Sequence, residues 1–325
     1  MRIITYREAL REALKQEMGR DDTIIMIGED IGRYGGPYKV SQGLFDEFGP
    51  DRVIDTPIAE TAIAGAALGA ALAGLRPIAE IMYIDFSFIC MDQIFNQIAK
   101  IRYMSGGNVI VPVVIRTQMG KKGSAAAQHS QCLEAIYAHI PGIKVITPST
   151  PYDAKGLLIS SIRENDPVVF IENCGLYSSK SEVPEKPYTI ELGKADIKRE
   201  GNDITVVAIS KSVRDSLEAA DELQNEGISV EVIDPRTIKP LDSDTILESI
   251  EKTHRLLITH EACKTGGLGA EIAAIVAENG MYNLDAPIKR IAAHDTPIPF
   301  APKMEDYVLP SKNDIIKGIR ELMKE

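Results

Sequence analysis

The pattern of apolar and polar positions predicts an amphipathic helix at the start of the chain. Thr5 and Glu8 have the spacing of a capping box, in which a hydroxyl and a carboxylate bond the first backbone N–H groups of a helix. Apolar residues then recur three and four positions apart, as one face of a helix requires; they are Ala9, Leu10, Ala13, Leu14 and Met18. We therefore expect a helix that begins directly after Thr5 and buries this face.

Most of the remaining chain alternates between short apolar runs, rich in β-branched residues, and longer segments with helical spacing. The expected strands of the first half are residues 24–27, 52–54, 77–84, 109–115, 143–146 and 168–172, and the expected helices are 62–75, 86–104 and 153–163. In the second half the expected strands are 204–210, 228–233, 256–260 and 288–293, with helices between them and a closing helix from 314. Such alternation predicts an α/β fold with two tandem domains of mostly parallel sheet covered by helices.

The alternation lapses between residues 179 and 203, where Pro184 and Pro187 lie among Ser, Glu and Lys residues. Proline cannot donate a backbone hydrogen bond, and a polar stretch lacks an apolar face, so this segment has the character of a linker. We expect a first domain at residues 1–178, a linker at 179–203 and a second domain at 204–325. A length of 325 residues agrees with two domains of ordinary size.

Residues 62–75 form an apolar segment that contains Gly65, Gly69 and Gly74. A helix that is apolar all round is buried, and its small residues let a second backbone approach closely. The pattern leaves two interpretations open. The helix lies at the centre of one domain, or it packs against another subunit.

Composition and charge narrow the classes of function. The formal net charge of −11 argues against a nucleic-acid-binding protein, because such proteins carry a basic face. No run of about 18 apolar residues indicates a membrane span, and the first residues lack an apolar signal core, so we expect a cytoplasmic protein. The four cysteines are scattered, which is typical of a reducing compartment without disulfides.

Several familiar site motifs are absent or incomplete. The sequence has no phosphate-binding G-x-x-x-x-G-K-[ST] loop, no G-x-S-x-G elbow and no H-E-x-x-H zinc helix. The pairs His129/Cys132 and His260/Cys263 lack a second pair of ligands, so zinc is not expected. The glycines of residues 266–269 open a helix, but without a full G-x-G-x-x-G they indicate a tight turn.

Glu60 lies where a short strand hands over to the apolar helix, within the segment DTPIAET (55–61). Ligands bind at the carboxyl ends of strands in parallel α/β sheets, and a glutamate that enters an apolar helix must be paired or used. The alternative is a glutamate that only stabilises the positive end of the helix dipole.

His129 is the single histidine in a loop of Gly, Ser, Ala and Gln residues, 121–131. An imidazole on such a loop suits proton transfer to a ligand. The alternative is a loop histidine with only a structural role.

Long motifs of this chain resemble the β subunit of the E1 component of thiamine diphosphate-dependent 2-oxo acid dehydrogenases, a family with transketolase-like domains. The motifs are IGEDIGRYGGPYKVSQGLFDEFG (27–49), RVIDTPIAETAIAGAALGAALAGLRPIAEIM (52–82), AAAQHSQ (125–131), HIPGIKVITPSTPYDAKGLL (139–158) and DTPIPFAPKMEDYVLP (295–310). They occur in the expected order and cover nearly the whole chain. The resemblance implies a pyrimidine-binding domain followed by a transketolase C-terminal-like domain.

The resemblance also implies which residues act. Glu60 matches the glutamate that bonds N1′ of the cofactor's aminopyrimidine, and His129 matches a histidine that faces the substrate and the lipoyl group. Phe86 matches an aromatic residue that stacks on the pyrimidine, with Met82 nearby, and Glu29 matches an acidic residue between two active sites. The family often holds a structural potassium ion, mainly by backbone carbonyls; the matching positions are Val113, Ser161, Ile162, Glu164 and Asp166.

The resemblance further implies partners and a reaction. An α subunit holds the diphosphate and Mg²⁺ through a GDG motif, which this chain lacks, so an α2β2 heterotetramer is expected, with the lipoyl acyltransferase E2 as the next partner. The expected reaction is oxidative decarboxylation of pyruvate or a branched-chain 2-oxo acid, or cleavage of acetoin, with acyl transfer to the lipoyl group. The alternatives are the C-terminal half of a split transketolase, which transfers ketol units between sugar phosphates, and a structural partner without catalytic residues.

Overall fold

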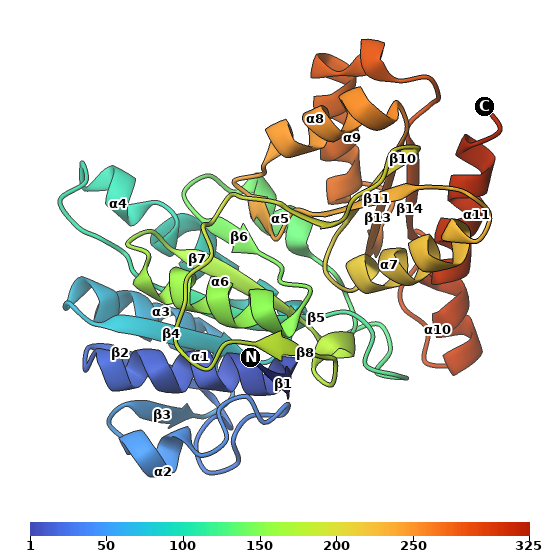
Figure 1. Ribbon diagram of the computed structural model, residues 1–325. Helices are drawn as coiled ribbons and strands as arrows, with labels where there is room; N and C mark the ends of the chain where they lie inside the picture. The colour runs from blue at the N-terminus through green and yellow to red at the C-terminus, as the bar shows by residue number, and fades with distance from the viewer. The chain divides into compact units, whose positions relative to one another are not determined.

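A computed structural model describes residues 1–325 and divides them into two compact units (Figure 1). The first comprises Met1–Met119 and Ile136–Leu192, and the second comprises Gly120–Ala135 and Gly193–Glu325. The second unit thus includes a short insertion from the first half of the sequence. Each unit contains a mostly parallel sheet, so the predicted α/β fold is confirmed.

The parallel sheet of the first unit has the strand order β6-β7-β5-β4-β2-β3. A separate antiparallel pair joins β1 to β8, two strands from opposite ends of the unit. The strands are β1 (Arg2–Thr5), β2 (Ile24–Glu29), β3 (Val53–Thr56), β4 (Arg76–Ile81), β5 (Val114–Met119), β6 (Lys144–Ile146), β7 (Val168–Asn173) and β8 (Lys180–Val183).

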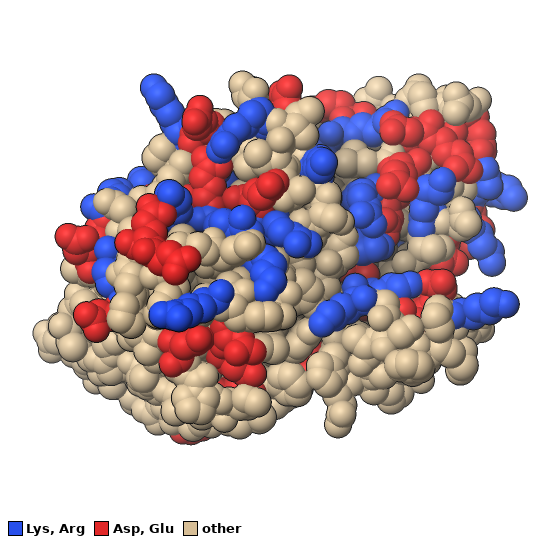
Figure 2. Space-filling model, turned by 90° about the horizontal axis from the view of Figure 1, so that it is seen from below, with Lys and Arg blue, Asp and Glu red and all other residues tan.

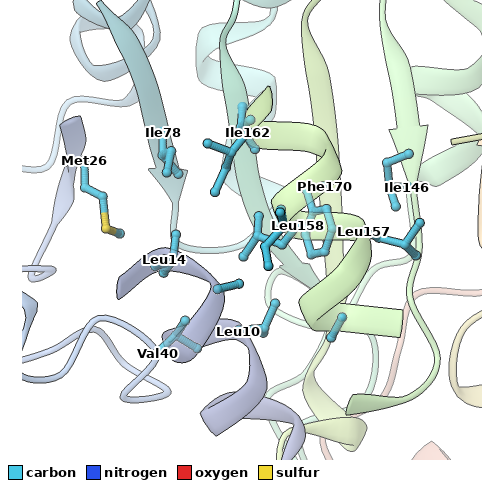
Figure 3. Packing of buried hydrophobic residues seen from close by; sticks show 14 of the residues in the cluster. Leu10, Leu14, Met26, Val40, Ile78, Ile146, Leu157, Leu158, Ile162 and Phe170 are labelled. Carbon is cyan, nitrogen blue, oxygen red and sulfur yellow. The ribbon is translucent and has the colours of Figure 1, made fainter. Parts of the chain in front are cut away.

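Helices α1 and α6 pack together over this sheet and bury its main core (Figure 3). Leu10 and Leu14 of α1 and Leu158 of α6 meet Met26 and Phe170 of the sheet. Thr5 and Glu8 form the predicted capping box. The helices are α1 (Tyr6–Arg20), α2 (Leu44–Phe48), α3 (Glu60–Leu72), α4 (Ile101–Met104), α5 (Glu134–His139) and α6 (Pro151–Arg163).

The second unit has a sheet of order β14-β13-β10-β11-β9, in which only β9 runs antiparallel. Its strands are β9 (Asp196–Arg199), β10 (Ile204–Ala208), β11 (Val230–Asp234), β12 (Thr237–Lys239), β13 (Leu256–Cys263) and β14 (Lys289–Ala293). Its helices are α7 (Lys211–Gln224), α8 (Ser243–Thr253), α9 (Leu268–Asn279), α10 (Pro302–Val308) and α11 (Lys312–Leu322). Apolar residues of α7 and α11 form the core with β10 and β11.

Three predicted segments differ from the structure. The expected linker 179–203 contains β8 and β9, because polar strands can be held by pairing partners that are distant in sequence. The expected helix 86–104 is instead a 3₁₀ helix (Ile84–Cys90), a π-helical turn (Asp92–Ile98) and α4. The expected strand 109–115 begins only at Val114.

Acidic and basic side chains are interspersed on the face shown in Figure 2. Exposed ion pairs such as Lys15–Glu47 (2.7 Å) and Lys312–Glu222 (3.1 Å) are of this kind, and pairs in water contribute little stability. None of the helices combines the length and apolar character that a membrane crossing needs.

Candidate cofactor site and catalytic loop

Three parallel strands of the first unit end close to the predicted cofactor residues. Glu29 ends β2 and pairs with Thr56 at the end of β3, and Met82 directly follows β4. Glu60 is the first residue of α3, shortly after β3. The carboxyl ends of neighbouring parallel strands lie at one sheet edge, which is where ligands bind in such folds.

Glu60 is a buried carboxylate with no partner in the chain. Its side chain is 7% exposed, and none of the hydrogen bonds or ion pairs of the structure involves it. Its negative charge instead acts on two neighbours. The pKa of Glu29 is raised mainly by burial, with Asp30 and Glu60 adding to the effect, and burial together with Glu60 raises the pKa of the Cys90 thiol to about 12. A largely buried carboxyl group in this position needs a hydrogen-bond partner from outside the chain.

That requirement fits an aminopyrimidine, whose ring nitrogen N1′ forms a hydrogen bond with a carboxyl group. No cation of the chain neutralises Glu60, so the position is open to such a partner. The chemistry of the donor set therefore agrees with the pyrimidine half of thiamine diphosphate. The diphosphate and its metal have no corresponding motif in this chain.

Phe86 lies in an aromatic cluster within the same unit. Its ring is half-buried and meets Tyr83 edge to face, with centroids 5.8 Å apart and planes at 86°. Tyr83 meets Tyr38 in the same way at 6.3 Å, and Tyr38 stacks on Tyr177 at 4.4 Å. The sequence gives no signal for this cluster, because its members come from three distant segments.

A buried charged triad supports the aromatic cluster. Arg116 of β5 lies between Glu80 of β4 (2.6 Å) and Glu172 of β7 (2.6 Å), and the Tyr177 hydroxyl donates to Glu172 at 2.6 Å. Burial opposes the charge of Arg116, but the two carboxylates raise its pKa above the usual value. Breaking one partner of such a pair leaves an uncompensated buried charge, so the triad gives Tyr177 a fixed position.

His129 belongs to the insertion that clusters with the second unit, whereas Glu60, Glu29, Met82 and Phe86 belong to the first. The segment has no helix or strand from residue 120 to 133, which agrees with the predicted loop. His129 is half-buried, and its backbone N–H donates to the Ala126 carbonyl at 3.4 Å. We refer to residues 121–131 as the His129 loop.

The positions expected to hold potassium lie at the end of α6 and beside β5. The carbonyl of Val113 accepts from the Val168 N–H at 2.9 Å, and that of Ser161 accepts from the Glu164 N–H at 3.3 Å. Arg76 donates to the Ile162 carbonyl at 2.8 and 3.0 Å and also to the carbonyl of Glu164.

Asp166, the fifth expected position, bonds the Arg102 guanidinium. The Arg76 guanidinium already bonds two of the expected carbonyls, those of Ile162 and Glu164, and supplies a positive charge there. The arrangement therefore fits arginine better than potassium.

Models of two protein families match the chain. "Transketolase, pyrimidine binding domain" matches residues 2–180, and "Transketolase, C-terminal domain" matches residues 193–315. The fold and the family models together define a protein of the transketolase-like, thiamine diphosphate-dependent class.

Relatives of nearly the same length narrow this class. The chain is 50% identical to the acetoin:2,6-dichlorophenolindophenol oxidoreductase subunit beta of Bacillus subtilis, over 100% of this chain and 98% of the relative. It is 49% identical to the pyruvate dehydrogenase E1 component subunit beta of Rickettsia felis, over 98% of each, and 47% identical to that of B. subtilis, over 99% of each. The chain belongs to the family of E1 β subunits of 2-oxo acid dehydrogenase complexes.

A solved structure described as "Split gene transketolase, inactive beta4 tetramer" has a TM-score of 0.81 and covers 99% of this chain and 98% of its own. Its sequence identity is 23%. This likeness concerns the fold alone.

Proposed function

We propose that the chain is the β subunit of an E1 enzyme that acts with an α subunit and thiamine diphosphate. The reaction is oxidative decarboxylation of a 2-oxo acid, or cleavage of acetoin, with transfer of the acyl group to the lipoyl group of E2. The observation that carries the proposal is the buried, unpartnered carboxylate of Glu60 at the carboxyl end of a parallel sheet. Thiamine diphosphate, when bound, supplies the nucleophilic carbon and the electron sink that these reactions need.

Glu60 holds a proton at N1′ of the aminopyrimidine and exchanges it during the reaction. A carboxyl group can donate this proton to N1′, stabilise the positive charge on the ring as the carboxylate, and take the proton back, which an amide cannot do. Burial strengthens this interaction, because few water molecules compete with it. Glu29 adds a second acidic group beside Glu60, and its pKa is raised by burial and by the charges of Asp30 and Glu60.

Phe86 and Met82 orient the pyrimidine ring. Both side chains are half-buried at the sheet edge where Glu60 begins α3, and an aromatic face is suited to stacking on a planar ring. His129 holds or donates a proton to the substrate and to the acyl acceptor. Its place on a loop of small residues suits a group that must meet two different partners.

The α subunit completes the site in an α2β2 tetramer, holds Mg²⁺ and the diphosphate, and presents the product to E2. One face of α3 supports this part of the proposal. Ala62, Ala66 and Leu72 are exposed along the helix, and Ile89, whose carbonyl accepts from Thr61 of α3 at 2.9 Å, is 61% exposed. Exposed apolar faces with small residues suit close packing of another subunit.

The test is Glu60→Gln in the reconstituted α/β enzyme. The substitution keeps the size and one hydrogen bond but removes proton exchange, so C2–H exchange of bound thiamine diphosphate should slow by about 10²–10⁴-fold. Assembly with the α subunit should remain near normal. Wild-type exchange in a well-folded Glu60→Gln enzyme would mean that Glu60 is only a helix-end charge.

Parallel activity assays identify the substrate, because the names of the relatives include both acetoin and pyruvate. Pyruvate, branched-chain 2-oxo acids and acetoin are assayed with lipoamide or an artificial electron acceptor, and sugar phosphates are assayed in parallel. Activity with sugar phosphates alone would favour the split-transketolase alternative over an E1 enzyme.

A further inference from the structure

The His129 loop has a backbone conformation that must be held by its surroundings. Ser124 and Ala126 adopt φ values of 54° and 63°, and the flanking Gly120 and Gly123 adopt 85° and 83°. Glycine takes this left-handed conformation freely, but for each L-residue it costs roughly 1–2 kcal/mol. Two such residues within three positions persist only where other contacts fix them.

A buried carboxylate provides one of these contacts. Glu305 of α10 is 1% exposed, although it carries a carboxyl group and lies on a short helix. Its Oε2 accepts from the Ser124 backbone N–H at 3.3 Å, and the same oxygen lies 3.5 Å from the Lys121 amine. Its Oε1 has no partner. Glu305 therefore holds the loop at its first strained residue.

Two further contacts close the loop. The Gly120 N–H donates to the Gln131 carbonyl at 3.3 Å and joins the two ends. Lys121 also bonds Asp306, the neighbour of Glu305, and although burial opposes its charge, these acidic partners raise the pKa of its amine. Residues 121 and 124 thus bond α10, and a backbone hydrogen bond joins the two ends of the loop.

The contact at Ser124 leads directly to His129. Ser124 and Ala126 set the direction of the chain, and the Ala126 carbonyl then accepts the His129 N–H at 3.4 Å. A change in the conformation at Ser124 would move this carbonyl and the turn that carries the imidazole. The contact from Glu305 comes from outside the loop and reaches its backbone.

We propose that Glu305 is a positioning residue for the E1 reaction: it fixes the strained His129 loop through the Ser124 backbone and so sets the place of the imidazole. It does not touch substrate or cofactor. The proposal rests on the role proposed for His129, but the link between Glu305 and the loop is independent of that role.

The test compares two variants of the same helix. Glu305→Gln keeps the size of the side chain and weakens a charge-assisted hydrogen bond to the loop backbone, whereas Asp306→Asn removes a partner only from the flexible end of Lys121. In the isolated chain, backbone hydrogen exchange within residues 121–131 should become about tenfold or more faster in Glu305→Gln and should change little in Asp306→Asn. Unchanged exchange in Glu305→Gln would overturn the proposal.

The second readout separates the half-reactions in the reconstituted enzyme. Glu305→Gln should slow acyl transfer to lipoamide by about tenfold to a hundredfold, while C2–H exchange of bound thiamine diphosphate, which depends on Glu60, stays within about twofold of the parent. A merely structural role would slow both steps together or neither, and either result would contradict positioning. Glu305→Asp, which keeps the charge, should recover part of the transfer rate.

His129→Ala separates failure of this proposal from failure of the proposed function. Transfer that is slow in His129→Ala but normal in Glu305→Gln overturns the positioning role alone. Transfer that is normal in both variants removes the catalytic role of His129, and with it the positioning role of Glu305 in the reaction.

Discussion

His260 belongs to β13, and its uncharged ring accepts a hydrogen bond from the first turn of α9. It is 1% exposed, and its Nε2 accepts from the Gly269 N–H at 3.1 Å. A Cβ at Gly267 would lie 2.6 Å from the ring, and one at Gly269 would lie 2.8 Å from it. The glycines of residues 266–269 therefore let this turn approach a buried ring, which agrees with the predicted tight turn.

The charge state of His260 makes the stability of the second unit depend on pH. Burial lowers its pKa to about 4, from 6.5 in the unfolded chain. The unfolded chain therefore binds more protons between these values, so this contribution is complete above pH 6.5 and is lost as the pH falls toward 4. The difference corresponds to about 3 kcal/mol at most.

His260→Gln should weaken that dependence, because glutamine does not titrate. Urea unfolding between pH 4 and 7.5, followed in the second unit by hydrogen exchange, measures the effect. Parallel pH profiles in the parent and the variant would show that His260 is not the group responsible.

At the scale of single residues, the sequence indicates a functional residue when that residue lies in a continuous motif, and it does not when the residue acts through a distant partner. Glu60 and His129 stand in continuous motifs, so the sequence alone marks both as candidates. Glu305 and Arg116 act through distant partners: Glu305 bonds a residue 181 positions away, and Arg116 bonds one 56 positions away. No periodicity or short motif indicates such pairs, because folding alone brings them together.

Among the elements, α3 is the one for which the sequence left two interpretations, a central helix of one domain or a helix packed against another subunit. Its apolar composition predicted burial, and Ile63, Ala64, Ala67 and Ala71 are indeed buried against the first unit. The remaining face carries small apolar residues that are exposed in the isolated chain. The buried face agrees with a helix inside one domain, whereas packing of the exposed face against another subunit stays a prediction.

Ala66→Arg tests that face. Ala66 is exposed, so the isolated chain should keep its fold, but a long charged side chain in a closely packed interface should weaken binding of the α subunit by at least tenfold. Ala277→Arg is the matched control, because it makes the same change at an exposed position of α9. Titration calorimetry with the α subunit gives both values, and equal affinities in the two variants would exclude α3 from the interface.

Elements with a strong local pattern were predicted well, and those held by distant partners were not. The capped helix α1 and the apolar strand β10 have signals within their own residues. Strands β1 and β8 are short and partly polar. They form because they pair with each other, although nearly the whole sequence of the first unit separates them. The π-helical turn after residue 91 interrupts a segment whose apolar spacing looks continuous in the sequence.

At the scale of the whole molecule, the sequence predicted two α/β domains and their order, which the family models match. It placed every residue before 179 in one domain, whereas the structure groups residues 120–135 with the second unit. Gly120 and Gly123 at the beginning of the His129 loop and the anchor at Glu305 account for this excursion. The grouping of residues 120–135 with the second unit depends on contacts with residues near the C-terminus, such as Glu305. The order of apolar segments in the sequence therefore does not indicate it.

The unpartnered carboxylate of Glu60 also has a consequence for how this subunit tolerates heat. A largely buried polar group without a partner costs up to about 1–3 kcal/mol, and the favourable end of the helix dipole offsets only about 0.3–1 kcal/mol of this. In the isolated chain Glu60→Gln should therefore melt a few degrees higher than the parent in calorimetry, and a lower melting temperature would mean that the carboxylate has a stabilising partner after all. Selection for heat resistance of this polypeptide alone would therefore tend to remove the glutamate for which a catalytic role is proposed. Thermal stability and activity would conflict in this way until the cofactor and the α subunit are present.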